Sequence, residues 1–329
     1  MRCFVEGLKQ GRLTRNLLVG FTSLLLSAGG YASESRCLIV ASYHDGFIGQ
    51  KLKVQGALDV LEGKCQIKQF DMDTKRNPDQ AFGEAKALEA KQLIEEWKPD
   101  VVITIDDNAA KYLVQPYYKD ADLPIVFSGV DWTAEAYGFP YNNVTGMIEV
   151  APMQALVRQM KRINPEAKTL YFMRPDRFSA VKNVDRMTKV LEAEGIDVVD
   201  LVVKTMDGFE QQYLEAQKGD FILFTNNAAI EGWDDKRASE YMLKHSETLV
   251  LTQSDWMVPF SMLAFTKVIE EQGEYAAEVA LKILEGHKPS EFPIVSNRKW
   301  NIYINEPLLK KSGAALPAGL IRKAEKYNP

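Results

Sequence analysis

Polar and aromatic side chains follow directly after most of the apolar, β-like runs of this chain. In open α/β sheets, ligands bind outside the carboxyl ends of the strands, so these positions are the candidates for a binding site. Carboxylates with aromatic rings suit a ligand that has a flat or cationic part. Arginines suit a carboxylate or phosphate, so the whole set predicts a zwitterion such as an amino acid. The candidate ligand-binding residues are His44, Asp106, Asp107, Asp131, Trp132, Arg174, Arg177, Ser179, Asn226, Asn227, Asp255 and Trp256.

Each candidate also has an ordinary structural interpretation. Asp106 or Asp107 is as suitable for capping the next helix as for contacting a ligand, and Ser179 is a possible cap too. Trp132 and Trp256 are equally suited to packing between two lobes of the protein. Exposed arginines such as Arg174 and Arg177, and a solvated loop histidine such as His44, are common without any ligand. These alternatives stay open at the level of sequence.

No catalytic motif accompanies these residues. The chain has no Gly-x-Ser-x-Gly element, no phosphate-binding loop and no dinucleotide glycine fingerprint after its first apolar run. His44 is the only histidine among the candidate residues, so a Ser-His-Asp triad at this site would depend on it alone. We therefore expect a non-enzymatic protein without a cofactor, with an exported enzyme on the same fold as a remote alternative. The three His residues, at 44, 245 and 287, form no cluster at ligand spacing, so no metal site is expected.

Apolar runs alternate with amphipathic helical stretches along the chain. The runs at 37–42 and 101–105 are continuous and lie between helical segments, which is typical of parallel strands buried on both faces. Such a series predicts a doubly wound sheet. A polar stretch at 137–146 interrupts the series, and a second series of the same kind follows it. The fold class predicted is therefore α/β, with two doubly wound, Rossmann-like lobes.

The chain is longer than one hydrophobic core usually supports, in agreement with two lobes. We predict a signal peptide over residues 1–32, a first lobe over 33–147 plus about 263–290, and a second lobe over 148–262 plus about 291–329. The late segments would cross between the lobes several times. Multiple crossings make a hinge rather than a flexible tether.

The amino-terminal segment predicts export. Arg12 and Arg15 precede an apolar run at 17–28, and small residues at Gly30 and Ala32 suit a signal peptidase. The run is shorter than the roughly 20 residues that span a membrane, although an uncleaved anchor is the alternative. No Cys lies at the cleavage region for lipid attachment. We expect a soluble periplasmic protein, a monomer, in a Gram-negative cell.

Cys37 and Cys65 each open an apolar β-like run. If those strands are parallel neighbours, both cysteines lie at the same end of the sheet and a disulfide is geometrically possible. Two buried free thiols are the alternative. The chain carries a net charge of −5 at pH 7, and the segment predicted to be removed is basic. An acidic mature protein argues against nucleic acid or an anionic membrane as partner.

Several ordered segments carry a resemblance to a known family. The chain resembles the substrate-binding proteins of ABC transporters, which have a periplasmic-binding-protein-like type I fold and some of which bind aromatic amino acids. The resemblance covers nearly the whole mature chain, and its separate pieces are weak singly but specific in order. They are Lys98-Pro-Asp-Val-Val-Ile-Thr-Ile105, Leu123-Pro-Ile-Val-Phe-Ser-Gly-Val130, Asn143-Val-Thr-Gly146, Ile163-Asn-Pro-Glu-Ala-Lys168, Ser254-Asp-Trp-Met-Val258 and Leu284-Glu-Gly-His-Lys-Pro289.

The resemblance implies a pocket at His44, the Asp106-Asp107 turn, residues 174–179, Asn226-Asn227 and Asp255. It also implies an ABC permease as partner, with a membrane signalling receptor that reads the closed form as the alternative. The chain departs from the family pattern at Asp106-Asp107, where small residues are usual, at Arg174 to Arg177, and at Trp256. The fold therefore carries over more firmly than the ligand does.

Overall fold

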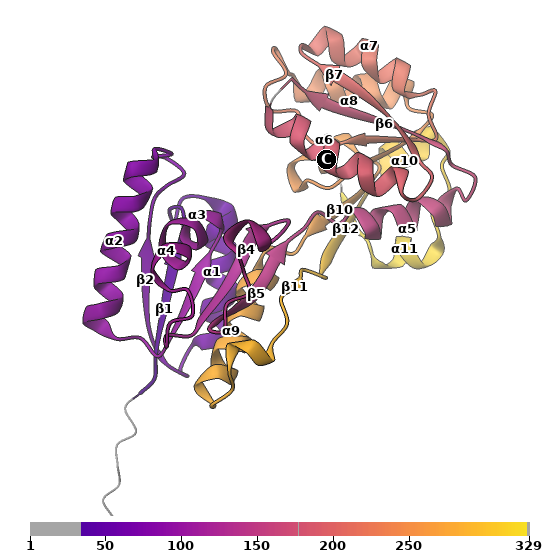
Figure 1. The fold of residues 1–329 in the computed structure, drawn as a ribbon. Helices are drawn as coiled ribbons and strands as arrows, with labels where there is room; N and C mark the ends of the chain where they lie inside the picture. The colour runs from indigo at the N-terminus through magenta and orange to yellow at the C-terminus, as the bar shows by residue number, and fades with distance from the viewer. Residues whose placement is uncertain (1–33, 177, 328–329) are drawn as a thin grey trace, which may run out of the picture. The chain divides into compact units, whose positions relative to one another are not determined.

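The computed structural model describes residues 34–176 and 178–327 (Figure 1). The predicted signal peptide lies outside the described residues. From Ser35 onward the chain forms one compact unit that contains two sheets. Within the described residues, no helix combines the length and apolar character needed to cross a membrane.

The first sheet is entirely parallel, with strand order β11-β5-β4-β3-β1-β2. Side chains alternate along β1, so Leu38 and Val40 enter the core on one face while Ile39 and Ala41 enter the core on the other. The strands are β1 (Arg36–Ala41), β2 (Gln66–Asp71), β3 (Val101–Ile105), β4 (Ile125–Asp131), β5 (Val144–Glu149) and β11 (Val295–Ser296).

Helices cover both faces of this sheet. One face packs against α1 and α9, and the other against α2 and the irregular helical segment that follows β3. The helices α1 and α9 approach very closely, because a Cβ at Gly273 would lie 1.7 Å from the carbonyl oxygen of Lys53. The helices are α1 (Ile48–Leu61), α2 (Gln80–Trp97), α3 (Asp107–Ala109), α4 (Gln115–Tyr117) and α9 (Glu270–Leu284), with a π-helical segment at Ala110–Val114.

The second sheet has the order β13-β12-β10-β9-β8-β6-β7, and β12 runs antiparallel to β10 while the other pairs are parallel. Its strands are β6 (Thr169–Pro175), β7 (Asp197–Val203), β8 (Phe221–Phe224), β9 (Leu249–Thr252), β10 (Leu263–Lys267), β12 (Trp300–Asn305) and β13 (Glu325–Tyr327). Its helices are α5 (Met153–Ile163), α6 (Phe178–Glu192), α7 (Met206–Ala216), α8 (Asp235–His245), α10 (Glu306–Ser312) and α11 (Ala318–Lys323). Two doubly wound sheets confirm the predicted fold class.

We call the first sheet with its covering helices lobe 1, and the second sheet with its helices lobe 2. The chain passes between them after β5, after β10 and after β11. These sheets divide the late segments differently from the predicted lobe boundaries. Leu263–Lys267 pairs with β9 and β12 in lobe 2, whereas Val295–Ser296 pairs with β5 in lobe 1. The reason is that β10 follows β9 after a single 3-10 turn, Asp255–Phe260, and therefore stays in the same sheet.

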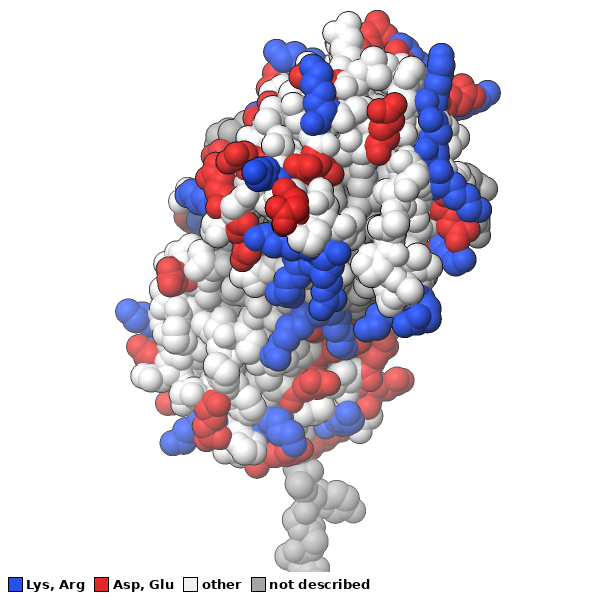
Figure 2. Space-filling view, turned by 90° about the vertical axis from the view of Figure 1, so that its right-hand side faces the viewer, with Lys and Arg blue, Asp and Glu red and all other residues white. Residues whose placement is uncertain are grey.

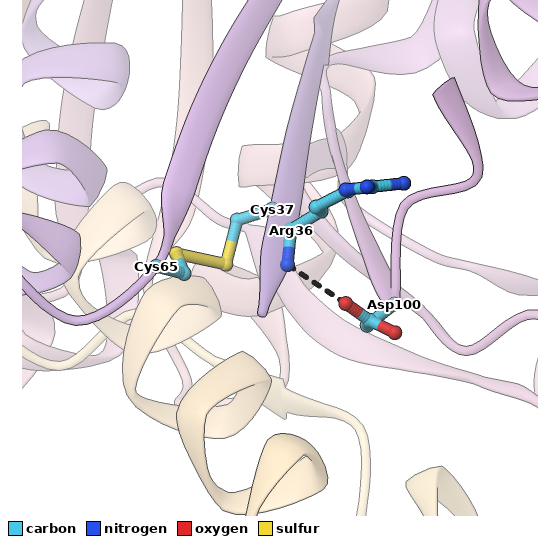
Figure 3. Close-up of a disulfide and its surroundings, with 4 residues drawn as sticks. All are labelled: Arg36, Cys37, Cys65 and Asp100. Atoms are coloured by element: carbon cyan, nitrogen blue, oxygen red, sulfur yellow. Dashed lines mark hydrogen bonds between the residues drawn. A yellow bond between two sulfur atoms is a disulfide. The ribbon is translucent and has the colours of Figure 1, made fainter. Parts of the chain in front are cut away.

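The predicted disulfide is confirmed. Cys37 and Cys65 are bonded with their Cα atoms 6.1 Å apart, and both are buried. Figure 3 shows the bond at the start of β1, beside a hydrogen bond in which the Arg36 amide donates to the Asp100 carboxylate at 2.8 Å. The parallel pairing of β1 with β2 brings the two cysteines to the same end of the sheet.

Candidate functional site

A cleft of about 510 Å³ is lined by residues of both lobes. They lie mainly at the carboxyl ends of the strands and in the segments that join the lobes, where an open α/β sheet places its ligands. Lobe 1 contributes Tyr43, Phe47, Lys53, Lys75, Asp106, Asp107, Asp131, Trp132 and Glu149, among others. Lobe 2 contributes Met187, Thr225, Asn226, Gln253, Ser254, Asp255, Trp256 and Lys267, among others.

The structure brings together most of the residues expected from sequence. Those that line the cleft are Asp106, Asp107, Asp131, Trp132, Asn226, Asp255 and Trp256. His44 is half-buried in the turn after β1 but does not line the cleft. Asn227 borders a separate pocket of lobe 2. Arg177 lies outside the described residues, and Ser179 belongs to α6 but its side chain is likewise not described.

Arg174 lies elsewhere, because its side chain is engaged within lobe 2. It is buried, and its guanidinium donates to both carboxylate oxygens of Asp200 at 2.8 and 2.6 Å. The strand β6 extends to Pro175, so Arg174 is a strand residue, and the carboxylate comes from Asp200 on the adjacent strand β7, two residues before the register partner Val202. A bidentate pair of this kind fixes the arginine in place. The predicted arginine contact with a ligand carboxylate therefore has no support from Arg174.

A buried ion-pair network, not expected from sequence, underlies the lobe 1 side of the cleft. The Lys53 ammonium pairs with Asp106 and, at 2.8 Å, with Glu149. Glu149 also pairs with Lys267 at the end of β10. One signal was available, since Lys53 lies on the same helix face as the apolar residue Ala57. A lysine on a buried helix face must find a carboxylate, because an unpaired buried charge is very costly.

The network sets the protonation of its members. Burial alone would lower the pKa of Lys53, but Asp106 and Glu149 raise it more, so the ammonium stays charged. Burial would raise the pKa of Glu149, but Lys53 and Lys267 lower it to about 2. For Asp106, burial raises the pKa more than Lys53 lowers it. One carboxylate of the network is thus firmly ionised and the other is destabilised in its charged form.

Two more carboxylates lie next to this network. Asp107 accepts a 2.7 Å hydrogen bond from the Tyr137 hydroxyl. Asp131 is exposed towards the cleft, yet burial of its carboxyl among neighbouring atoms, followed by repulsion from Glu149 and Asp107, raises its pKa to about 6. Asp107, Asp131 and Glu149 are neighbouring carboxylates, and such a group of like charges favours the approach of a cation.

The backbone is strained at two residues that line the cleft, Asp106 and Trp132. Asp106 has φ of 64° directly after β3, and Trp132 has φ of 66° directly after β4. Non-glycine residues adopt this region at a cost of about 1–3 kcal/mol each, and the surrounding structure must hold them there. Backbone bonds do so, since the Asp106 amide donates to Ser128 and the Trp132 amide to Glu149, both at 2.9 Å. Strain held in place at a cleft is typical of a functional site.

Unpaired polar atoms mark the same cleft. Among the described residues, Oδ2 of Asp106 and Oε1 of Gln253 are buried without a hydrogen-bond partner. Asp106 is only 5% exposed and Gln253 8% exposed. Buried polar atoms are nearly always hydrogen-bonded in folded proteins. These two acceptors belong to residues that line the cleft, while the other unpaired buried atoms found among the described residues belong to residues that do not line it.

Aromatic rings form the remaining walls. Tyr43 and Phe47 pack edge to face at 5.3 Å, and the Lys75 ammonium lies over both rings at 4.8 and 4.6 Å. The Arg186 guanidinium of lobe 2 lies over the Trp132 ring at 5.1 Å. Trp256 is 60% exposed. Within the part of the chain that the structure describes, no group of three or more His, Cys, Asp or Glu residues is arranged to hold a metal ion.

Comparison with known proteins identifies the family and the fold of this chain. A family model described as "ABC transporter substrate binding protein" matches residues 40–328. No curated protein sequence matches the chain. The solved structures that it resembles include a ligand-free, open substrate-binding protein with adhesive properties from Clostridium difficile, with 18% identity and a TM-score of 0.68. That alignment covers 89% of this chain and 99% of the other.

Two further solved structures share the fold. One is an ABC domain in complex with L-Trp from Streptococcus pneumonia, at 19% identity and a TM-score of 0.55, covering 88% of this chain and 99% of that one. The other is an ABC transporter solute-binding protein from Bacillus halodurans with bound myo-inositol, at 11% identity and a TM-score of 0.50, covering 87% and 100%. At these identities the likeness establishes the periplasmic-binding-protein type I fold.

Proposed function

Because the chain belongs to the ABC transporter substrate-binding protein family, we propose that it is the periplasmic solute-binding component of an ABC-type importer. It captures a small polar ligand in the cleft between its lobes by closure of the hinge. Its partner is an ABC permease, and it acts as a soluble monomer. Members of this family bind small molecules and typically work with such permeases.

One observation carries this proposal most directly. The same cleft is lined by strand ends of lobe 1 and of lobe 2, and three segments of chain join the lobes beside it. The joining segments are bonded to each other: Asn297 accepts from the Val150 amide at 2.8 Å, and Glu271 accepts from the amides of Arg298 and Lys299 at 2.8–3.1 Å. Such a connection allows hinge closure around a ligand rather than free tumbling of the lobes.

The proposed ligand class is an amino acid or a similar zwitterion. The carboxylates and rings of the cleft support the ammonium half of that proposal. The carboxylate half rested on the arginines, and Arg174 is engaged by Asp200 instead.

Isothermal titration of the purified protein against amino acids, amines and sugars tests the capture of a ligand. We expect one class to bind with a stoichiometry near one and to compact the protein in small-angle X-ray scattering, because closure brings the lobes together. Trp132→Ala should weaken that binding at least tenfold, whereas Trp97→Ala, outside the cleft, should not. Failure of every solute to bind would contradict the proposal, and binding of sugars alone would contradict the zwitterion class.

A periplasmic sensor is the second candidate, since a membrane receptor reads the same closed form. Uptake of the radiolabelled ligand by cells with and without the gene separates the two roles. Loss of uptake on deletion supports import, and so do neighbouring genes for a permease and an ATPase. Unchanged uptake together with a lost transcriptional response would favour the sensor. The alternative of an exported enzyme loses its proposed base, because His44 does not line the cleft.

A further inference from the structure

The charges that line the cleft do not cancel. Five carboxylates and three ammonium groups border it. Two of the ammonium groups, Lys53 and Lys267, are already engaged by Asp106 and Glu149. The carboxylates left over are Asp107, Asp131 and Asp255. In the described part of the chain, the ion pairs found include none to these three.

The third ammonium group, Lys75, offsets only one of these three carboxylates. The Lys75 ammonium lies over the rings of Tyr43 and Phe47, which already stabilise its charge. Arg174, the described arginine expected to receive a ligand carboxylate, is bound to Asp200 outside the cleft. The residues that line the cleft carry five negative and three positive charges, and this surplus repels a ligand carboxylate, although the Arg186 guanidinium over the Trp132 ring offsets part of it.

Two buried acceptor atoms belong to residues that line the cleft. Oδ2 of Asp106, in a residue more than nine-tenths buried, lacks a hydrogen-bond donor among the described residues. Oε1 of Gln253, equally buried, lacks one as well. Ammonium N–H groups are donors only, so a ligand with a primary, secondary or tertiary ammonium group suits acceptors of this kind, and a carboxylate adds nothing to that match.

The aromatic walls behave as cation receptors. The Trp132 ring already lies under the Arg186 guanidinium at 5.1 Å. Trp256 is 60% exposed and directly follows Asp255 in the chain. Trp256 and Asp255 both line the cleft, and exposed indole rings and carboxylates are the groups that bind organic cations, including quaternary ammonium groups.

We propose that the cleft selects an organic cation, meaning an amine or a quaternary ammonium compound without a carboxylate, and that Asp107, Asp131 and Asp255 hold its positive group. This inference rests on the proposed function, because it takes the cleft as the ligand site. Of the two charged groups of a zwitterion, it keeps only the positive one.

Two matched pairs of ligands test the proposal by isothermal titration at pH 7.5. The pairs are phenethylamine with phenylalanine, and choline with glycine betaine, so that each pair differs by one carboxylate group. We expect the cation of at least one pair to bind at least tenfold more tightly than its zwitterion. Zwitterions that bind as tightly as the cations, or cations that do not bind at all, overturn the proposal.

A failure of the cation inference can be distinguished from a failure of the proposed function. If an amino acid or sugar binds and closes the lobes while the cations fail, the cation inference is wrong and the proposed function stands. If no solute binds, the proposed function fails with it.

A charge-neutral variant adds a second readout. Asp131→Asn should weaken binding of the preferred cation at least tenfold at pH 7.5. Asp122→Asn removes an exposed carboxylate outside the cleft and should leave the affinity unchanged. Equal effects of the two substitutions would show that only the net charge of the protein matters, and would overturn the assignment of Asp131.

The pH dependence sharpens the test with choline, whose own charge does not titrate. The groups that face Asp131 are Glu149, Asp107, Lys267 and Lys53. Because the pKa of Asp131 is raised to about 6, cation affinity should fall as the pH is lowered from 7.5 to 5. Burial raises the pKa of Asp106 as well, so the comparison with Asp131→Asn is needed to isolate the share of Asp131. An identical pH profile in both proteins would contradict its role.

Discussion

The two lobes present different chemistry to the same cleft. Lobe 1 lines it with the ion-pair network of Lys53, Asp106 and Glu149, and with two residues in strained backbone. Lobe 2 lines it mainly with the neutral side chains of Thr225, Asn226, Gln253 and Ser254. Its buried arginine is paired with Asp200 outside the cleft.

The difference arises although both lobes are doubly wound. The topology places strand ends at the cleft in each lobe, but it does not decide which side chains follow them. In lobe 1 a lysine from the helix α1 reaches the strand ends and holds the carboxylates in place. The ion pairs thus hold the lobe 1 side of the cleft in place, whereas the lobe 2 side offers mainly neutral hydrogen-bonding groups. Surface charges of both signs are interspersed on the face shown in Figure 2.

The largest expected effect comes from removing the lysine at the centre of the lobe 1 wall. Lys53→Met leaves Asp106 and Glu149 buried close together with one cation fewer, so unfolding in urea should show a loss of about 3–5 kcal/mol. Lys51→Met, at an exposed position of the same helix, should change the free energy of unfolding by less than about 0.5 kcal/mol. Similar values for both variants would mean that the network is not a stabilising part of lobe 1.

The disulfide is the next largest contribution, and it belongs to lobe 1 alone. Replacing both Cys37 and Cys65 by Ala should lower the free energy of unfolding by about 3–4 kcal/mol, because the bond closes a loop with a sequence separation of 28. The measurement is chemical denaturation of both proteins with and without reductant. The variant should not respond to reductant. A variant as stable as the parent would show that the core around the two residues compensates fully.

Arg174→Met tests the lobe 2 side of the comparison. Loss of the bidentate pair with Asp200 should cost about 1–3 kcal/mol of stability, since the arginine is buried and its partner is charged. Ligand affinity should stay within about twofold of the parent, because the pair is outside the cleft. A tenfold loss of ligand affinity in a folded variant would show that Arg174 contributes to ligand binding.

The smallest effect should come from Asp131 in the absence of a ligand. Its folded-state pKa of about 6 lies above the ordinary value of 3.8, so the fold favours the protonated form. That stabilisation is present below about pH 4 and is lost as the pH rises through 6. Asp131→Asn should therefore raise Tm relative to the parent at pH 7.5 and match it at pH 4. A pH-independent difference in Tm would show that the substitution acts through packing instead.

Much of the fold was predictable from local patterns. Continuous apolar runs such as Val101–Ile105 predict buried parallel strands, and those runs form the centre of the first sheet. The pairing of Cys37 with Cys65 followed from their equal position at the start of two strands. The division of the late segments was harder to predict, because a short strand such as Val295–Ser296 carries no periodicity that assigns it to a sheet.

The sequence by itself determined the fold class and the positions at the strand ends, because these depend on hydrophobic period and on order along the chain. It predicted the disulfide with two free thiols as the alternative, and the structure decided between them. Only the tertiary structure decided which of those residues share the cleft. It removed Arg174, because β6 continues through this residue to Pro175 and the adjacent strand β7 supplies Asp200. It added Lys53, because a helix residue meets the strand ends only after packing. Distances between separate elements set charge pairing, and no local pattern contains them.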